Sequence, residues 1–257
     1  MRSVCALRAW SAIAPGLPTT AHWQQWAIQP WCPSGELALD LSHIPSMVRR
    51  RLGPLAKLAV SAADVVLAQT SQPDLPVVWV SRYGDSDKSL ALLQSQAIGE
   101  PLSPMAFGLS VHNGIGAQHS ILRGIRSNSV CVATSNGAPE AGMMEALGLL
   151  HEGASEVMLV CYEAPLPTPY DRFHDEPQPH YAWAVLLALA APGELGFSLK
   201  TIPATASDIC QSLKSGLPHG LEVLHFLLSR ERASLCVRHG SGEQQRSGCW
   251  WWERCGG

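Results

Sequence analysis

Two short stretches carry side chains whose types and spacing could support nucleophilic catalysis. Ser110 and His112 lie two residues apart, so in an extended segment both point to one side and the imidazole could activate the hydroxyl. No Gly-Xaa-Ser-Xaa-Gly motif surrounds this serine. Cys131 lies in the apolar run 130–134, where burial raises the pKa of a thiol and leaves little thiolate. We therefore interpret Cys131 as a core residue and keep Ser110 with His112 as a candidate nucleophile and base.

Two further stretches have polar side chains in informative positions. The run 130–134 ends in a tight turn, Thr134-Ser135-Asn136-Gly137, that leads into a helix-like segment. Asparagine caps helices and tolerates the left-handed conformation, so Asn136 suits a structural turn. The run Arg49-Arg50-Arg51 could bind a phosphate group or an acidic protein surface, although a short basic run also suits a solvated helix start.

Strand-like and helix-like segments alternate along the chain. Strands are expected at 4–13, 77–81, 130–134, 157–162, 181–190 and 196–202. Helices are expected at 55–69, 85–97, around Glu145-Ala146, 208–215 and 220–229. Ser86 is the expected N-cap of the second helix, with Leu90, Leu92 and Leu93 on its apolar side. This alternation predicts an α/β domain with a largely parallel sheet and helices on both faces.

Aromatic residues mark two other segments. The region with Trp23, Trp26 and Trp31 has no clean period and is expected to be irregular. The C-terminal runs are expected to form a hairpin at 233–253, whose turn reads His239-Gly240-Ser241-Gly242. Alternation along its second strand would place Trp250 and Trp252 on one face and Trp251 on the other.

Composition limits the functional classes. The 257 residues are 46% hydrophobic and 15% charged, with a net charge of -3, which gives no electrostatic argument for binding nucleic acid or an anionic membrane. The low charge indicates that part of the surface is covered by a partner. Arg8 interrupts the N-terminal apolar run and the apolar stretch 182–191 is too short to span a bilayer, so we expect a cytoplasmic protein without a transmembrane segment.

The eight cysteines are expected to be thiols rather than disulfides. Cys5, Cys131, Cys161 and Cys236 lie in apolar, strand-like runs, where cysteine behaves as a small hydrophobe. No Cys-Xaa-Xaa-Cys pair is present, so neither a zinc site nor a redox motif is supported, and no metal is expected.

Several motifs, in order over roughly residues 5–200, resemble the β-ketoacyl synthase-like N-terminal domain family. They include Ser81-Arg82-Tyr83-Gly84-Asp85, Ser110-Val111-His112-Asn113 and Tyr162-Glu163-Ala164-Pro165. Within that family the chain is most similar to chain-length-factor-type subunits of aryl polyene biosynthesis, a type II polyketide or fatty-acid-like system. The turn that reads Thr-Ala-Cys-Xaa-Ser-Gly in condensing enzymes here reads Thr134-Ser135-Asn136-Gly137-Ala138-Pro139.

The resemblance implies a thiolase-like half-fold. We expect a mixed, mostly parallel five-stranded sheet with helices on both faces, in one domain over 1–257. Asn136 would stand at the nucleophile-cysteine position, or Gly137 if the register slips by one, and neither can form an acyl thioester. The half that supplies the activating histidines of ketosynthases is not recognisable, and we interpret His239-Gly240-Ser241-Gly242 as a coincidental match to their His-Gly-Thr-Gly motif.

These resemblances imply a non-catalytic partner that forms a heterodimer with a full-length β-ketoacyl synthase. No bound cofactor is expected; acyl-phosphopantetheine on an acyl carrier protein would be the substrate of the complex. The segments 129–135 and 111–123 would form the interface. Interface or tunnel candidates are Ser110, His112, Asn113, Cys131, Thr134 and Asn136. Carrier-protein contact candidates are Arg49, Arg50 and Arg51.

Two alternatives stay open. The first is an independent acyl-thioester enzyme that uses Ser110 and His112. The second is a scaffold that binds the carrier protein and neither catalyses nor shapes the product.

Overall fold

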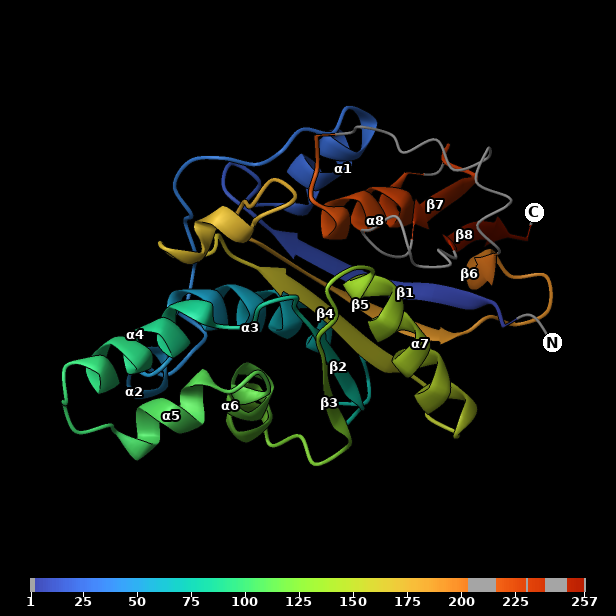
Figure 1. Ribbon diagram of the computed structural model, residues 1–257. Helices are drawn as coiled ribbons and strands as arrows, with labels where there is room; N and C mark the ends of the chain where they lie inside the picture. The colour runs from blue at the N-terminus through green and yellow to red at the C-terminus, as the bar shows by residue number, and fades with distance from the viewer. Residues whose placement is uncertain (1–2, 203–215, 230, 239–248, 257) are drawn as a thin grey trace.

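The computed structural model describes residues 3–202, 216–229, 231–238 and 249–256. The strands of these residues form one eight-stranded sheet in the order β3-β2-β4-β5-β1-β6-β8-β7 (Figure 1). Their bounds are β1 Cys5–Ile13, β2 Val77–Val80, β3 Ser129–Val132, β4 Val157–Glu163, β5 Tyr181–Leu189, β6 Gly196–Ile202, β7 Ser234–Arg238 and β8 Cys249–Cys255.

The sheet is mixed rather than mostly parallel. Strand β2 pairs in parallel with β3 and β4, whereas the other pairings of the described strands are antiparallel. The expected five-stranded, mostly parallel sheet is therefore wrong in strand number and in direction. Parallel strands need helical crossovers, which connect β2 to β3 and β3 to β4. The segment 164–180 between β4 and β5 contains only the 3-10 turn η1, Tyr170–Phe173, so β5 returns antiparallel.

Helices cover both faces of the sheet, as the sequence predicts (Figure 1). The helix bounds are α1 Thr20–Ile28, α2 Ser46–Arg49, α3 Pro54–Leu67, α4 Ser86–Ala97, α5 Pro104–Ser110, α6 Gly114–Arg123, α7 Ala138–His151 and α8 His219–Leu228. Helices α1, α7 and α8 pack on one face, and α3 and α6 pack on the other. Alternate residues of the fully buried strand β4 enter the two cores, so β4 lies at the centre of the domain.

The part of the tryptophan-rich region with Trp23 and Trp26 is helix α1, which corrects the expected irregular segment there, whereas Trp31 lies beyond the helix in an irregular stretch. The indoles of Trp23 and Trp26 are fully buried and pack edge to face, with ring centroids 5.0 Å apart. Trp23 Nε1 donates to the Leu17 carbonyl at 3.0 Å, and Trp26 Nε1 donates to the Trp31 carbonyl at 2.7 Å. The sequence shows no clear helical period because α1 is anchored by two indoles and not by a continuous apolar stripe.

The second predicted helix is present, but its environment differs from expectation. Asp85, not Ser86, occupies the N-cap position of α4. No residue of α4 or of α5 is buried, and Leu93 is 52% exposed. The leucines therefore do not face the core of this chain.

The predicted C-terminal hairpin is formed by β7 and β8, which pair antiparallel. Trp252 is buried, and Trp250 packs against the same core, as alternation predicts. The hairpin extends the sheet through β6, which joins β1 through the single register pair Cys5 and Phe197. The predicted helix 208–215 and the motif 239–242 lie outside the described residues.

One of the cysteines is not a free thiol. Cys236 is disulfide-bonded, which corrects its assignment as a free thiol, whereas Cys5, Cys131 and Cys161 are free.

Within the described ranges, no helix has the length and apolar character needed to cross a bilayer.

Candidate functional site

The turn between β3 and α7 is built around Gly137. This residue has φ +69° and forms the N-cap position of α7, which corrects the expectation that Asn136 takes the left-handed conformation or the cap. A Cβ atom at Gly137 would lie 3.0 Å from Trp250 Nε1. Two features therefore favour glycine at this position: the positive φ, which strains residues with a Cβ atom, and the close approach of β8.

Asn136 lies half-buried just before this glycine, and its turn is held locally. The Thr134 hydroxyl donates to the Asn136 carbonyl at 2.9 Å. The residues of the turn that could replace a cysteine, Asn136 and Gly137, offer no thiol or hydroxyl group. The turn keeps the strand-to-helix geometry without a nucleophile at either register.

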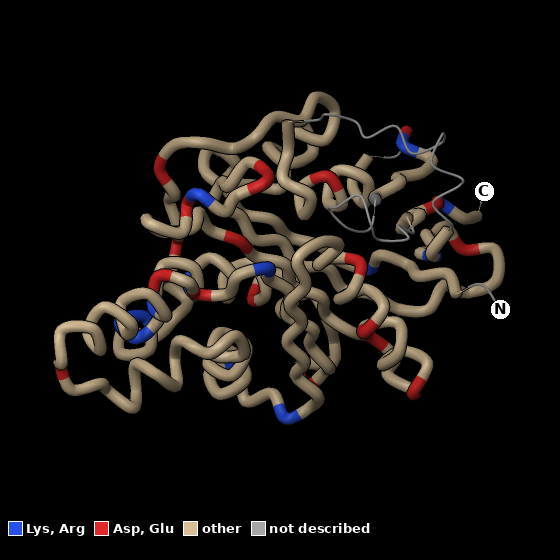
Figure 2. Tube along the Cα trace, viewed as in Figure 1, with Lys and Arg blue, Asp and Glu red and all other residues tan. Residues whose placement is uncertain are grey.

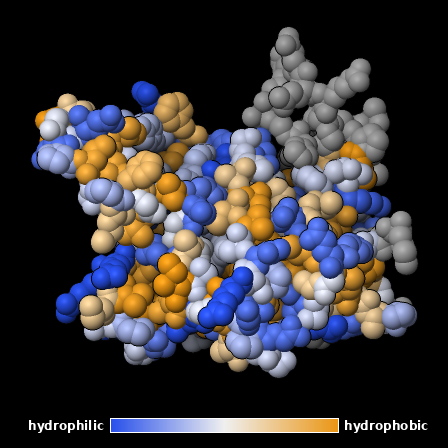
Figure 3. Space-filling model, turned by 90° about the horizontal axis from the view of Figure 1, so that it is seen from below, coloured by the Kyte–Doolittle hydropathy of each residue, from blue (hydrophilic) through white to orange (hydrophobic). Residues whose placement is uncertain are grey.

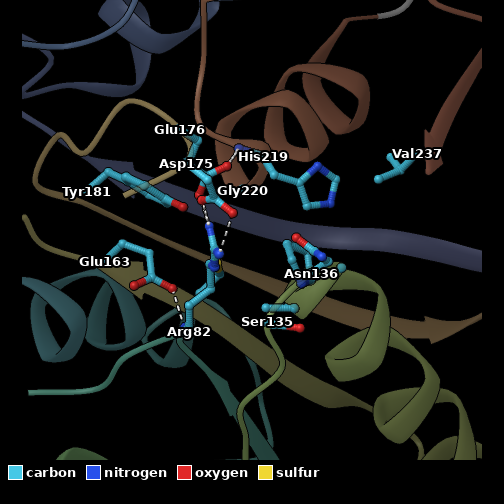
Figure 4. A pocket seen from close by; sticks show the side chains of 14 residues that line it. Arg82, Ser135, Asn136, Glu163, Asp175, Glu176, Tyr181, His219, Gly220 and Val237 are labelled. Carbon is cyan, nitrogen blue, oxygen red and sulfur yellow. Dashed lines mark hydrogen bonds and ion pairs between the residues drawn. The ribbon is translucent and has the colours of Figure 1, made fainter. Parts of the chain in front are cut away.

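The turn borders a cavity of about 400 Å³ (Figure 4). We call it the elbow cavity. Its wall combines the β3–α7 turn, β4, the segment before β5 and the N-terminus of α8. The lining residues are Arg82, Ser135, Asn136, Gly137, Ala138, Pro139, Cys161, Glu163, Asp175, Glu176, Tyr181, His219, Gly220 and Val237.

A buried ion pair holds the C-terminal elements against α7 beside the cavity. His219 Nε2 and Glu140 Oε2 are 2.8 Å apart, and Trp252 Nε1 donates to Glu140 Oε1 at 2.7 Å. Burial alone would lower the pKa of His219, but the Glu140 carboxylate outweighs it and raises that pKa to about 10. Burial would likewise raise the pKa of Glu140, yet His219 and Trp252 hold it below its ordinary value. Both groups are therefore charged near neutral pH.

A second charged network, centred on Arg82, also lines the elbow cavity (Figure 4). Arg82 Nη1 and Nη2 donate to the two carboxylate oxygens of Asp175 at 2.8 and 3.1 Å. Arg82 Nη1 also donates to Glu176 Oε1 at 3.1 Å. Glu176 Oε2 in turn accepts the backbone N–H of His219 at 2.8 Å. Glu176 thus links Arg82, which follows β2, to the N-terminus of α8.

Glu163 completes this network at the end of β4. It accepts the Arg82 backbone N–H at 2.5 Å and the Ser81 hydroxyl at 3.2 Å. Burial, with a further contribution from the charge of Glu176, raises the pKa of Glu163 to about 8 despite these donors. A proton is therefore retained on this carboxyl group at neutral pH.

The sequence does not single out this charged set as a site. Arg82 and Glu163 lie in the two quoted motifs Ser81–Asp85 and Tyr162–Pro165, at the ends of predicted strands. Because β2 and β4 pair in parallel, their carboxyl ends meet at one edge of the sheet. That rule could have brought Arg82 and Glu163 together. Asp175 and Glu176 come from a segment without a periodic signal, and the predicted helix 220–229 does not show that His219, at its start, approaches them.

The Ser110–Asn113 stretch does not line the elbow cavity. The Ser110 hydroxyl donates to the Phe107 carbonyl at 2.9 Å, and His112 Nε2 bonds the Ser81 carbonyl at 2.9 Å. No hydrogen bond joins Ser110 to His112 in the described structure. Asn113 lies at the N-cap position of α6 without a side-chain cap. The His112 imidazole thus serves as a hydrogen-bond partner of the Ser81 carbonyl.

The remaining candidates occupy other places. Cys131 packs beside the α3–α6 core, and burial raises the pKa of its thiol to about 11. Arg49 Nη1 donates to the Leu41 carbonyl at 3.3 Å, whereas Arg50 and Arg51 are exposed. Of the interface, tunnel and carrier-contact candidates, Asn136 lines the elbow cavity, as does Gly137, the alternative at the slipped register.

Solved structures share this fold. A chain of the complex of the ketosynthase ApeO with its chain length factor ApeC, from Xenorhabdus doucetiae, is similar over 99% of this chain and 100% of its own length. Its identity is 28% and its TM-score is 0.79. The ishigamide ketosynthase/chain length factor shares the fold at 13% identity and a TM-score of 0.72, covering 99% and 100% of the two chains.

A chain of AntDE:AntF, a type II acyl carrier protein in complex with its ketosynthase bound to the hexaketide, also shares the fold. Its identity is 14% and its TM-score is 0.66, with both chains fully covered. Among curated proteins, none matches the chain. The family model for the beta-ketoacyl synthase N-terminal domain matches residues 23–253. The chain therefore belongs to the β-ketoacyl synthase N-terminal domain family.

Proposed function

We propose that this chain is a non-catalytic, chain-length-factor-type subunit that forms a heterodimer with a cysteine-containing β-ketoacyl synthase. The observation that carries the proposal is the β3–α7 turn, in which Gly137 has a positive φ and which offers only Asn136 or Gly137 at the position that the family resemblance assigns to the nucleophile. Decarboxylative condensation requires a thiolate, and neither residue at the turn can supply one. The active ketosynthase would provide the chemistry.

An unpaired edge supports a partner. Strand β3 is the first strand of the sheet and pairs only with β2 among the described residues. An exposed edge offers free backbone donors and acceptors to another strand. We therefore infer that β3 pairs with the partner's strand, with α6 beside it.

The helices next to this edge also favour a partner. Large apolar side chains on or beside α5 and α6 are exposed: Met105 65%, Phe107 61%, Val111 37% and Ile121 83%. Figure 2 shows few charged residues along these helices, and Figure 3 shows hydrophobic patches on the underside of the molecule. Uncharged apolar surface of this kind is typical of an interface.

The role of the subunit would be to shape the product. Its bulky residues would help to close the acyl tunnel that the two subunits share and so limit the length of a polyene chain. The acyl group would arrive as a phosphopantetheine thioester on an acyl carrier protein. Arg50 and Arg51 are exposed and fit an acidic carrier, whereas Arg49 is engaged with the Leu41 carbonyl.

The alternatives receive less support from the geometry. An enzyme based on Ser110 and His112 would need their side chains to meet, yet each bonds a different backbone carbonyl. Hydrolysis of an acyl thioester that is lost in Ser110→Ala would revive that hypothesis. For a scaffold, enlarging exposed residues of α6 would change the product yield but not its length.

Co-expression with a full-length ketosynthase tests the proposal. We expect a stable one-to-one complex in size-exclusion chromatography with mass detection, and poor solubility of this chain alone. A soluble monomer that does not bind the ketosynthase would overturn the proposal.

A further inference from the structure

The proposed partner role assigns no task to Arg82 and the carboxyl groups that it contacts. The Arg82 side chain is only 12% exposed and lines the elbow cavity. Four donor contacts from its side chain and backbone N–H reach three different carboxyl groups, yet its Nε–H is buried without a hydrogen-bond partner among the described residues. A buried donor without a partner is costly, so the present arrangement leaves the guanidinium incompletely satisfied.

The structure already shows how a carboxylate binds here. The Glu176 carboxylate lies between Arg82 Nη1 and the backbone N–H of His219, at the start of the ten-residue helix α8. It is therefore an intramolecular occupant of a site formed by a guanidinium and a helix N-terminus, both of which favour anions.

The second carboxylate on Arg82 is the more exposed one. Asp175 takes both Nη atoms, but its side chain is 51% exposed, against 22% for Glu176. Asp175 lies in the irregular segment before β5 and borders both the elbow cavity and an outer groove of about 650 Å³. A ligand that enters from this groove would meet the Asp175–Arg82 pair first.

The other charged groups around the cavity add no net positive charge, because the His219 imidazole lies between the carboxylates of Glu140 and Glu222. His219 is paired with Glu140, and Glu163 retains its proton near neutral pH. Arg82, shared between Asp175 and Glu176, leaves one surplus negative charge. An added anion would be repelled unless it replaced one of these two carboxylates.

We propose that the elbow cavity binds a small carboxylate-bearing molecule, whose carboxylate replaces the Asp175 side chain on Arg82. Asp175 then turns toward the outer groove, and the Arg82 guanidinium keeps its contact with Glu176. The rest of the ligand occupies the cavity between Arg82 and Asn136. The site does not depend on the partner role.

The test is titration of the full chain, alone or in its ketosynthase complex, with acetate and separately with inorganic phosphate at fixed ionic strength. Asp175→Asn removes the competing charge and should tighten acetate binding by about tenfold, as expected for the loss of a charge-assisted competitor. Arg82→Lys keeps the charge but loses the bidentate geometry, and it should weaken binding. Asp171→Asn is the matched control, because Asp171 lies in the same segment but bonds its own turn.

Any acetate or phosphate that the ketosynthase itself binds is the same for every variant, so it cancels when variants of this chain are compared. Equal acetate affinity in wild type and Asp175→Asn, or an increase that Asp171→Asn reproduces, would overturn the site. Tighter binding of phosphate than of acetate in Asp175→Asn would overturn the assignment to carboxylates. If the ketosynthase complex does not form, the titration of the chain alone still decides this proposal.

Discussion

At the scale of single residues, Gly137 determines whether the β3–α7 turn can form. Its φ is +69°, and only 3.0 Å separates Trp250 Nε1 from the position that a Cβ atom would take, so any L-residue is disfavoured there. We expect Gly137→Ala to lower the free energy of unfolding by about 1–2 kcal/mol, the cost of a left-handed conformation with a Cβ. Chemical denaturation measures this loss.

Gly148 in the same helix is the matched control. It lies in the interior of α7, and nothing lies within 4 Å of the position that its Cβ would take. Gly148→Ala should therefore stabilise the protein by about 0.5–1 kcal/mol. If both substitutions change the free energy of unfolding in the same direction, the assignment of strain to Gly137 is incorrect.

Glu163 gives a prediction about pH. Its pKa is raised by burial to about 8 in the folded protein, so near neutral pH the folded state holds a proton that the unfolded state has released. The stability from this group is fully present below its unfolded pKa of 4.5 and is lost as the pH rises through about 8. Melting temperatures between about pH 5 and pH 9 should fall less steeply for Glu163→Gln than for wild type. Parallel profiles would contradict the assignment.

At the scale of elements, the exposed face of α6 is the clearest test of the proposed interface. Ile121 on α6 is 83% exposed, and Ile28 on α1 is 84% exposed but lies on the opposite face of the sheet (Figure 1). A glutamate at either position should leave folding unchanged, because neither side chain is in the core. Ile121→Glu should weaken the ketosynthase complex at least about tenfold through a desolvated charge, whereas Ile28→Glu should not. Equal effects on the dissociation constant would argue against this interface.

The elements also show which parts of the fold are predictable. Hydrophobic patterns predict fully buried runs such as β4 and the helical period of α3, because those patterns report burial directly. The left-handed residue lies one position beyond the predicted one, at Gly137, because glycine has no Cβ atom and adopts a positive φ more readily than asparagine. The apolar side predicted for α4 is not buried, because an apolar stripe has the same sequence pattern whether it packs in the core or lies at the surface.

At the scale of the whole molecule, the order of the strands is the part that the sequence does not reveal. The resemblance predicts five mostly parallel strands, whereas β6, β8 and β7 extend the sheet beyond β1. These three strands are predicted individually, at 196–202 and in the hairpin 233–253, but their addition to the sheet beyond β1 depends on non-local pairing that leaves no local pattern. The same distant segments bring His219 and Trp252 to Glu140 beside the elbow cavity, which explains why the sequence does not predict the charged half of the site.

The proposed non-catalytic role means that this chain would supply no acyl acceptor within a condensing complex. Intact-protein mass spectrometry of the one-to-one complex, after incubation with an acyl-loaded carrier protein, measures where the acyl group is bound. We expect the ketosynthase to gain the mass of the acyl group while this chain keeps its unmodified mass. An acyl adduct on this chain, lost in Ser110→Ala or in Cys131→Ala, would overturn the non-catalytic role and identify a nucleophile outside the β3–α7 turn.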